Sequence, residues 1–383
     1  MISLPARLRG VDAATRAAFS FVAIGMALLL PACGGGSGGA GTGPVSAAPT
    51  ITMQPQSQTV ATGDEVVFSV SVSASGQPSF QWYRNGAPIA GATQSSYTLP
   101  AGTTTLADSG ASFSVIVTND GGSVTSTAAT LTLNADPEGL YFGTLSLNLA
   151  QKALPVFAII AKDGTAAAYV TDHMSPAGVN APVGYSLHGV VVKPSGAKFS
   201  SSFTALLPSG YQFSNGEPTS TGTLDGTISP GSSITGTFTS NLDSGTFVLN
   251  AMTTDYNRPA SLATVAGTYA YDSAYMAMGT EQVFHTVSTA NADGSGSATA
   301  SNGCTSTSVS HSIPDPMHNL YETTAHFACS YSPDVVFTAL SAFFPAGTGA
   351  GIIGPAAFAS DTIVIITDDV GDQVAYMIVE AKQ

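Results

Sequence analysis

The chain has 383 residues, with 10 Lys and Arg against 24 Asp and Glu, which gives a formal net charge of −14. A chain this acidic is not expected to bind nucleic acid or anionic headgroups through charge. Charged residues make up only 9% of the chain, whereas glycine, serine and threonine are abundant, so its polarity is mostly neutral. This composition is typical of an extracytoplasmic β-protein rather than of a cytosolic helical enzyme.

Residues 1–32 have the three parts of a secretory signal peptide. A basic start with Arg7, Arg9 and Arg16 precedes an apolar run at 17–30, and small residues follow before Cys33. The apolar run is shorter than the roughly 20 residues that a helix needs to span a bilayer. We therefore predict a cleaved leader rather than a permanent transmembrane segment.

The residues around the predicted cleavage point carry a resemblance. Leu30, Pro31, Ala32 and Cys33 resemble the bacterial lipobox, in which the cysteine thiol receives a diacylglycerol and its amine is acylated after cleavage. The resemblance implies a lipid anchor at Cys33, and each buried CH₂ contributes about 0.8 kcal/mol to attachment. Gly34 stands where inner-membrane lipoproteins often carry Asp, which favours the outer membrane. The alternative is a secreted protein with an incidental cysteine.

Residues 33–48 read as the lipidated cysteine and a flexible tether. Glycine and serine dominate this stretch, and its root-mean-square reach is roughly 20 Å by flexible-chain scaling. We expect the tether to hold the folded part away from the lipid, on the cell surface or otherwise on the periplasmic face.

Residues 49–134 form the first predicted folded unit. Short runs of alternating apolar residues are separated by turn signals such as Asn85-Gly86, which predicts a β-sandwich. The segments GDEVVFSVSV, FQWYRNGAPIAGA and LADSGASFSVIVTNDGGSVTS resemble a bacterial immunoglobulin-like domain.

The immunoglobulin resemblance assigns four core residues. Trp82 matches the buried core tryptophan of that fold, and Phe113 replaces its corner tyrosine. Val70 and Val115 stand where the family often has its inter-sheet cysteines, so this unit is expected to lack a disulfide. Trp82 could instead be a stacking platform for a sugar, but its strand position favours the core.

Residues 139–383 form a second unit with a weak internal repeat. GLYFG at 139–143 matches GTYAY at 267–271, and Asp-Gly pairs follow at 163–164 and 293–294. Helical periodicity is almost absent, and strands are predicted at 199–207, 221–228, 234–239, 246–249, 362–367 and 374–379.

A sheet of eight or more strands tends to close, because closure removes its free edges. We therefore predict an all-β protein, in which the sandwich is followed by one antiparallel β-barrel built from two half-repeats. Two tandem sandwiches are the alternative. The pattern GxYxG, followed by a strand and an Asp-Gly turn, resembles the barrels of surface lipoproteins of the transferrin-binding protein B type.

Cys304 and Cys329 are predicted to form a disulfide. If they face each other across an antiparallel hairpin, its centre falls in IPDPMHN, which is a turn sequence. Opposed cysteines in such a hairpin lie within disulfide reach, and closing the loop should stabilise the fold by roughly 3 kcal/mol. Two free thiols in an oxidising compartment are the alternative.

Two apparent catalytic or cofactor motifs are interpreted as loops. Gly349, Gly351 and Gly354 spell GxGxxG, but the next strand follows too soon for the helix that binds a pyrophosphate. Ser195 and Lys198 fit SxxK, but they run into a strand rather than a helix.

The histidines do not predict a metal site. His285, His311, His318 and His326 lie in one region of the sequence but show no metal-type spacing, and the Asp residues mostly occupy turns. No catalytic residue, cofactor or metal is predicted.

These features predict a lipid-anchored cell-envelope protein that is displayed at the surface and binds or adheres without catalysis. A protein or a glycan is the expected ligand. The alternatives are an envelope hydrolase acting on a glycan and a lipocalin-like carrier of a small apolar ligand.

Overall fold

The structure is a computed structural model that describes residues 46–383 except 176–181, 209, 278–279, 330–331, 351, 354–355 and 370–373. Residues 46–383 form one compact unit, and the predicted leader, Cys33 and most of the tether lie outside the described residues. Within the described part, no helix is both long and apolar enough to cross a bilayer. The helical elements described are a 3-10 turn at Leu106–Asp108, α1 (Thr253–Tyr256) and α2 (Leu262–Val265).

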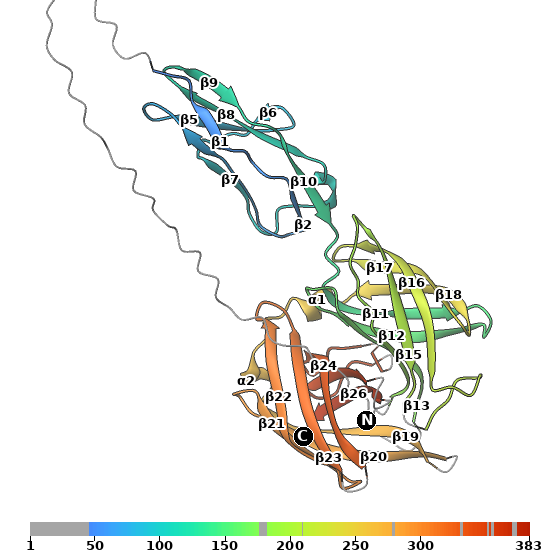
Figure 1. The fold of residues 1–383 in the computed structure, drawn as a ribbon. Helices are drawn as coiled ribbons and strands as arrows, with labels where there is room; N and C mark the ends of the chain where they lie inside the picture. The colour runs from blue at the N-terminus through green and yellow to red at the C-terminus, as the bar shows by residue number, and fades with distance from the viewer. Residues whose placement is uncertain are drawn as a thin grey trace, which may run out of the picture. The chain divides into compact units, whose positions relative to one another are not determined.

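The first ten strands form an immunoglobulin-like β-sandwich (Figure 1). One sheet has the order β2-β10-β8-β5-β6 with β9 also paired to β8, while β3 pairs with β7 and β1 with β4. Inward and outward side chains alternate along β8, as the apolar periodicity predicts. The strands are β1 (Thr50–Met53), β2 (Gln58–Ala61), β3 (Val66–Ser69), β4 (Ser71–Ser73), β5 (Ser79–Arg84), β6 (Ala87–Pro88), β7 (Ser96–Leu99), β8 (Ser112–Asn119), β9 (Gly122–Thr125) and β10 (Ala129–Asn134).

The core of the sandwich is a single apolar cluster around the tryptophan. Val70, Trp82, Phe113 and Val115 are all buried in it, and the Trp82 indole N–H donates to the carbonyl of Gln94 at 2.9 Å. Apolar packing thus fills the positions where related domains have a disulfide and a corner tyrosine.

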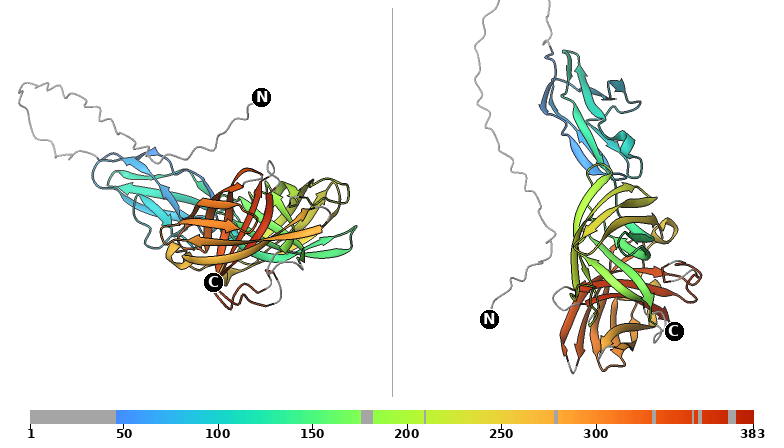
Figure 2. Two further views of the ribbon diagram at one scale, coloured as in Figure 1. Left: turned by 90° about the horizontal axis from the view of Figure 1, so that it is seen from below. Right: turned by 90° about the vertical axis from the view of Figure 1, so that its right-hand side faces the viewer.

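The rest of the chain forms two closed antiparallel barrels of eight strands each, which corrects the prediction of one shared barrel (Figures 1 and 2). The all-β class, the antiparallel barrel strands and the two repeats are confirmed. Each repeat closes separately because it carries eight strands of its own: β11 pairs with β18, and β19 pairs with β26.

The strands predicted from the sequence coincide with β15 to β18, β25 and β26 to within a few residues. The first barrel comprises β11 (Gly139–Leu147), β12 (Lys152–Ile160), β13 (Ala166–Met174), β14 (Pro182–His188), β15 (Lys198–Leu206), β16 (Thr219–Ser229), β17 (Ser233–Ser240) and β18 (Ser244–Ala251). The second comprises β19 (Gly267–Ala277), β20 (Thr280–Ala290), β21 (Ser295–Ala300), β22 (Thr305–Asp315), β23 (Leu320–Cys329), β24 (Ser332–Phe344), β25 (Thr362–Asp369) and β26 (Val374–Lys382).

The sequence repeat marks the first strand of each barrel. β11 begins at Gly139 and β19 at Gly267, and a buried tyrosine lies two residues farther along each strand. The hydroxyls of Tyr141 and Tyr269 donate to the carbonyl four residues earlier, at 3.0 and 2.8 Å. Each tyrosine therefore ties the start of its barrel to the segment that leads into it.

The Asp-Gly turns of the two repeats have the same backbone geometry. Gly164 and Gly294 both have a φ of +87°, and the Asp before each accepts the backbone N–H two residues on, at 2.8 and 2.9 Å. A Cβ on Gly164 would lie 2.4 Å from the carbonyl oxygen of Val192, and one on Gly294 would lie 2.5 Å from that of His311. Both turns thus need glycine for its conformation and for its lack of a side chain.

The two barrels share an apolar cluster on their outer walls. Phe157 on β12 meets Phe344 on β24 edge to face, with ring centroids 6.1 Å apart. This contact explains why residues 156–160 are buried at every position: Val156 and Ala158 face the lumen, while Phe157 faces the other barrel.

The hairpin predicted around Cys304 and Cys329 is confirmed. β22 pairs with β23 through a turn at residues 316–319, and Thr305 pairs with Ala328. Cys304 immediately precedes Thr305 and Cys329 immediately follows Ala328.

Candidate ligand-binding site

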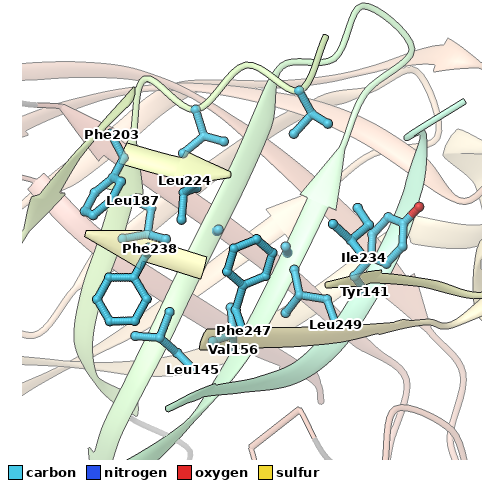
Figure 3. Packing of buried hydrophobic residues seen from close by; sticks show 14 of the residues in the cluster. Tyr141, Leu145, Val156, Leu187, Phe203, Leu224, Ile234, Phe238, Phe247 and Leu249 are labelled. Carbon is cyan, nitrogen blue, oxygen red and sulfur yellow. The ribbon is translucent and has the colours of Figure 1, made fainter. Parts of the chain in front are cut away.

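The interior of the first barrel is apolar, and it is nearly filled at one end. Its inward side chains form one buried cluster drawn from all eight strands (Figure 3). Around Ile160, Ala166 and Val192, near the Asp163-Gly164 turn, packing leaves a cavity of only about 50 Å³.

At the other end the first barrel opens into a cup of about 750 Å³. Leu207 and residues 211–214 contribute to its mouth, where the rings of Tyr185 and Phe213 meet edge to face at 5.7 Å. The apolar wall of the cup includes Leu145, Leu147, Leu154, Val183, Tyr185, Leu187, Phe203, Ala205, Leu207, Phe213, Leu224 and Phe238.

Cross-strand pairs of phenylalanine and glycine shape the lumen. Phe203 pairs with Gly222, and a Cβ on that glycine would lie 2.6 Å from the ring, so the ring lies over the glycine. An aromatic ring that covers a glycine in this way lines the wall instead of filling the centre. The other pairs are Phe199 with Gly226, Phe247 with Gly236, and Phe238 with Gly245.

The charged groups at the mouth are paired. Lys152 forms an ion pair with Asp172, whose carboxylate also bonds to His173 at 3.0 Å. Partial burial acts to raise the pKa of Asp172, but the bonds from Lys152 and His173 outweigh it, and the pKa lies below its usual value. Asp243 accepts the backbone N–H groups of Leu149, Ala150 and Ser244, at 2.9, 3.2 and 2.7 Å.

The interior of the second barrel combines apolar side chains, such as Val309, Ile365 and Ile378, with buried polar ones. Glu380, His311 and Ser288 line a cavity of only about 20 Å³, which has room for about one water molecule. Burial raises the pKa of Glu380 to about 7, partly offset by Ser288, and burial lowers the pKa of His311. The two repeats thus enclose chemically different interiors.

The described residues of the serine and glycine motifs lie in a turn and a loop. Ser195 and Lys198 face each other across a tight turn with Gly196 at φ +63°, and the Ser195 N–H donates to the Lys198 carbonyl at 2.8 Å. Gly349 lies in a loop at φ +73°, and Gly351 and Gly354 fall outside the described residues.

Two further histidines form separate pairs with aspartates. His285 bonds to Asp272 at 2.8 Å and His318 to Asp315 at 2.7 Å, whereas His311 is buried against Thr323 at 3.0 Å. His318 and Asp315 also lie beside the Glu138 carboxylate, a convergence that the sequence did not reveal because Glu138 precedes β11.

The match to a protein-family model lies in the immunoglobulin-like unit. The family model for the immunoglobulin domain matches residues 48–129. No curated protein matches the chain.

Several solved structures share a weak likeness with the whole chain. An I-band fragment of titin is 10% identical, and the match covers 76% of this chain and 97% of the fragment, with a TM-score of 0.25. Sidekick-1 immunoglobulin domains 1 to 5 are also 10% identical, with coverages of 88% and 98% and a TM-score of 0.21. A quinonprotein alcohol dehydrogenase-like protein from Bacteroides thetaiotaomicron is 11% identical, with coverages of 82% and 96% and a TM-score of 0.21. At such TM-scores these likenesses carry no argument, and the family model identifies residues 48–129 as an immunoglobulin-like domain.

Proposed function

We propose that the chain is a cell-envelope binding protein that takes a small apolar molecule into the cup of its first barrel. The observation that carries this proposal is a cavity of about 750 Å³ with leucine and aromatic walls, open at one end of the barrel. Small-molecule sites are commonly clefts of about 300 to 1,000 Å³ with mostly apolar walls. Each Å² of apolar surface that leaves water contributes about 25 cal/mol to binding.

The pairing at the mouth supports an uncharged ligand. Asp172 is engaged by Lys152 and His173, and Asp243 is held by backbone N–H groups. A charged ligand would have to compete with these partners, whereas an apolar one gains affinity from the walls. For the same reason neither carboxylate is poised as a general acid or base, and we propose binding rather than glycan hydrolysis.

Filling the cup tests this proposal. Ala205 lies in the cup wall and is buried, so Ala205→Trp should fill the cavity. We expect it to weaken binding of the apolar fluorophore N-phenyl-1-naphthylamine by about ten-fold or more, equivalent to about 1.4 kcal/mol.

Val248→Trp is the matched control, because Val248 is 43% exposed on the same barrel. This variant should bind the fluorophore as the unchanged protein does, and circular dichroism should show that both variants fold. Equal affinity in all three folded proteins would contradict the proposal. Native mass spectrometry of the purified mature chain gives a second measurement, in which we expect a retained apolar molecule.

The second part of the proposal is a lipid on Cys33 that holds the protein at the outer membrane, on the cell surface or otherwise on the periplasmic face. The lipobox-like residues Leu30, Pro31 and Ala32 support it, as does the glycine-rich tether that follows. Intact-mass analysis of native protein should give a chain that begins at Cys33 and carries diacylglycerol and an amide-linked acyl group. An unmodified thiol or a retained leader would contradict the anchor.

Adhesion to a protein or glycan is the second candidate function. The immunoglobulin-domain match at residues 48–129 favours it, because this fold commonly presents binding surfaces. Binding to a protein or glycan array that survives Ala205→Trp would assign adhesion to a surface outside the cup.

A further inference from the structure

Two segments of the chain bring metal-ligating side chains together beside the second barrel. The linker before β11 supplies Glu138, while the end of β22 supplies Asp315 and the turn that follows it supplies His318. One ligand atom from each of these residues lies within 4.8 Å of the other two. Helix α1, which lies between the barrels in the sequence, adds the ring of Tyr256 to the same place.

The cluster contains two buried polar atoms whose hydrogen bonding is incomplete. The Tyr256 hydroxyl interacts with the Glu138 carboxyl group, but the hydroxyl and Glu138 Oε1 are both shielded from solvent and neither makes a hydrogen bond of normal geometry. A buried polar atom without a partner costs about 1 to 3 kcal/mol. Native structures commonly satisfy such atoms with an ordered water or an ion.

The imidazole in the cluster is held in place. Asp315 Oδ2 bonds to His318 Nδ1 at 2.7 Å, and the Tyr256 ring stacks on the imidazole with centroids 4.3 Å apart and an interplanar angle of 7°. The stacked Tyr256 ring therefore holds the plane of the imidazole.

The turn that carries these ligands is anchored by a buried asparagine. The Asn319 backbone N–H donates to the carbonyl of Tyr256 at 2.9 Å, and its side-chain amide donates to the carbonyl of Asp255 at 3.1 Å. The Asn319 side chain also exchanges hydrogen bonds with the backbone of Phe343 on β24, at 2.6 and 2.9 Å. The turn is therefore fixed to both α1 and the wall of the second barrel.

The local charge also favours a cation. Lys162 is a nearby basic group, and it is engaged by Asp64 at 3.0 Å and by Asp136 at 2.9 Å. These two carboxylates engage Lys162, and the cluster itself contains the imidazole of His318 and the carboxyl groups of Glu138 and Asp315. One divalent cation would balance the two carboxyl groups in their ionised form.

We propose that Glu138, Asp315 and His318 bind one divalent transition-metal ion of the zinc type, with water completing its coordination. Zinc is commonly held by imidazole nitrogen together with carboxylate oxygen, and three protein ligands leave one position for water. Calcium and magnesium prefer oxygen ligands alone, so the imidazole selects against them. The bound ion joins the entry of the first barrel to a turn of the second.

Zinc titration tests the proposed site. The mature chain carrying Cys33→Ser, which removes the anchor thiol, is stripped with a chelator and titrated with Zn²⁺ in a calorimeter. We expect one saturable site per chain, and His318→Ala should weaken it by more than the roughly 10- to 100-fold that the loss of an outer-shell partner costs, because a direct ligand is lost. Glu138→Gln keeps the size of the side chain but removes a charge, and it should weaken binding by about ten-fold.

His285→Ala is the matched control. His285 forms the same kind of pair with an aspartate, at 2.8 Å from Asp272, but it is not part of the three-residue cluster. This variant should bind Zn²⁺ as tightly as the parent, and Zn²⁺ should raise the thermal unfolding midpoint of both but not that of His318→Ala.

Several results would overturn the proposal. These are no saturable binding in the parent, an equal loss in His318→Ala and His285→Ala, and equal affinity for Ca²⁺ and Zn²⁺. If His318→Ala fails to fold, Glu138→Gln still tests the site. Unchanged Zn²⁺ affinity in Glu138→Gln would contradict the proposal.

Discussion

Glu380 is the residue at which burial and charge conflict most directly. It lies inside the second barrel, 6% exposed, beside Ser288 and near Tyr271 and His311. Burial raises its pKa from 4.5 to about 7, because the low-polarity interior disfavours the carboxylate. The protonated form is therefore the one that the barrel accommodates.

We predict that Glu380 lowers the free energy of unfolding as the pH rises. Above 4.5 the unfolded chain loses this proton while the folded chain keeps it, so stability declines until the folded group also ionises at about pH 7. A shift of this size corresponds to about 3 kcal/mol. Glu380→Gln should therefore be more stable than the parent by about that amount near pH 8 in urea unfolding, and equal to it near pH 4.

The buried histidine in the same cavity does not obscure this comparison. Burial lowers the pKa of His311, so its contribution to stability is lost as the pH falls, in the parent and in the variant alike. It cancels in the difference between the two proteins. The same difference in stability at both pH values would contradict the prediction.

At the scale of elements, the Asp-Gly turns show why the repeat is visible in the sequence. Each turn combines a positive φ with a close approach of a neighbouring carbonyl, which only glycine satisfies. Residues elsewhere in the strands need only alternate apolar and polar character, so the two repeats have diverged in them.

We predict that Gly164→Ala destabilises the protein more than Gly231→Ala does. Both residues have positive φ, at +87° and +64°, so alanine costs about 1 to 2 kcal/mol at either position. A Cβ at 164 also meets the Val192 carbonyl at 2.4 Å, whereas nothing lies within 4 Å at 231. Urea unfolding of the two variants measures the difference, and equal losses would show that the turn relaxes around the new methyl group.

The hairpin between β22 and β23 carries the disulfide prediction. Thr305 pairs with Ala328, and Cys304 and Cys329 are the residues directly next to this pair in the sequence. Closing such a loop should contribute about 3 kcal/mol. Peptide mapping without reductant should give a Cys304–Cys329 cross-linked pair, and a reductant should lower the unfolding midpoint. Free thiols at both positions would contradict the prediction.

At the scale of the whole molecule, the contact between the barrels couples two units that could each close alone. The outer faces of β11 to β13 pack against β24 to β26 through a continuous apolar cluster, in which Phe157 meets Phe344. Each barrel thus depends on the other to bury part of its outer wall.

Two neighbouring phenylalanines allow a test of this coupling. Phe344 lies in the shared cluster, whereas Phe343 points into the second barrel, and both are buried. Replacing either with alanine should cost about 3 to 5 kcal/mol. Only Phe344→Ala should speed hydrogen exchange in β12 of the first barrel, and equal exchange in the two variants would show that the barrels are independent.

Local patterns were sufficient to predict much of this fold. Alternating apolar residues predicted the strands, the repeat located β11 and β19, and the symmetry of Cys304 and Cys329 about a turn predicted a hairpin. These features depend on residues that are close in sequence or on a short motif that recurs. The interactions that produce these patterns lie within one strand or between two neighbouring strands.

The tertiary structure alone decided how the strands close and what they enclose. Pairing of β11 with β18 joins segments about a hundred residues apart, and the sequence pattern is the same whether the sheet closes once or twice. The cup depends on rings that lie over glycines on the neighbouring strand, and Glu138 meets His318 only when both barrels are folded. Sequence thus determined the strands and turns, because those follow from local sterics and periodicity, while long-range pairing determined the sites.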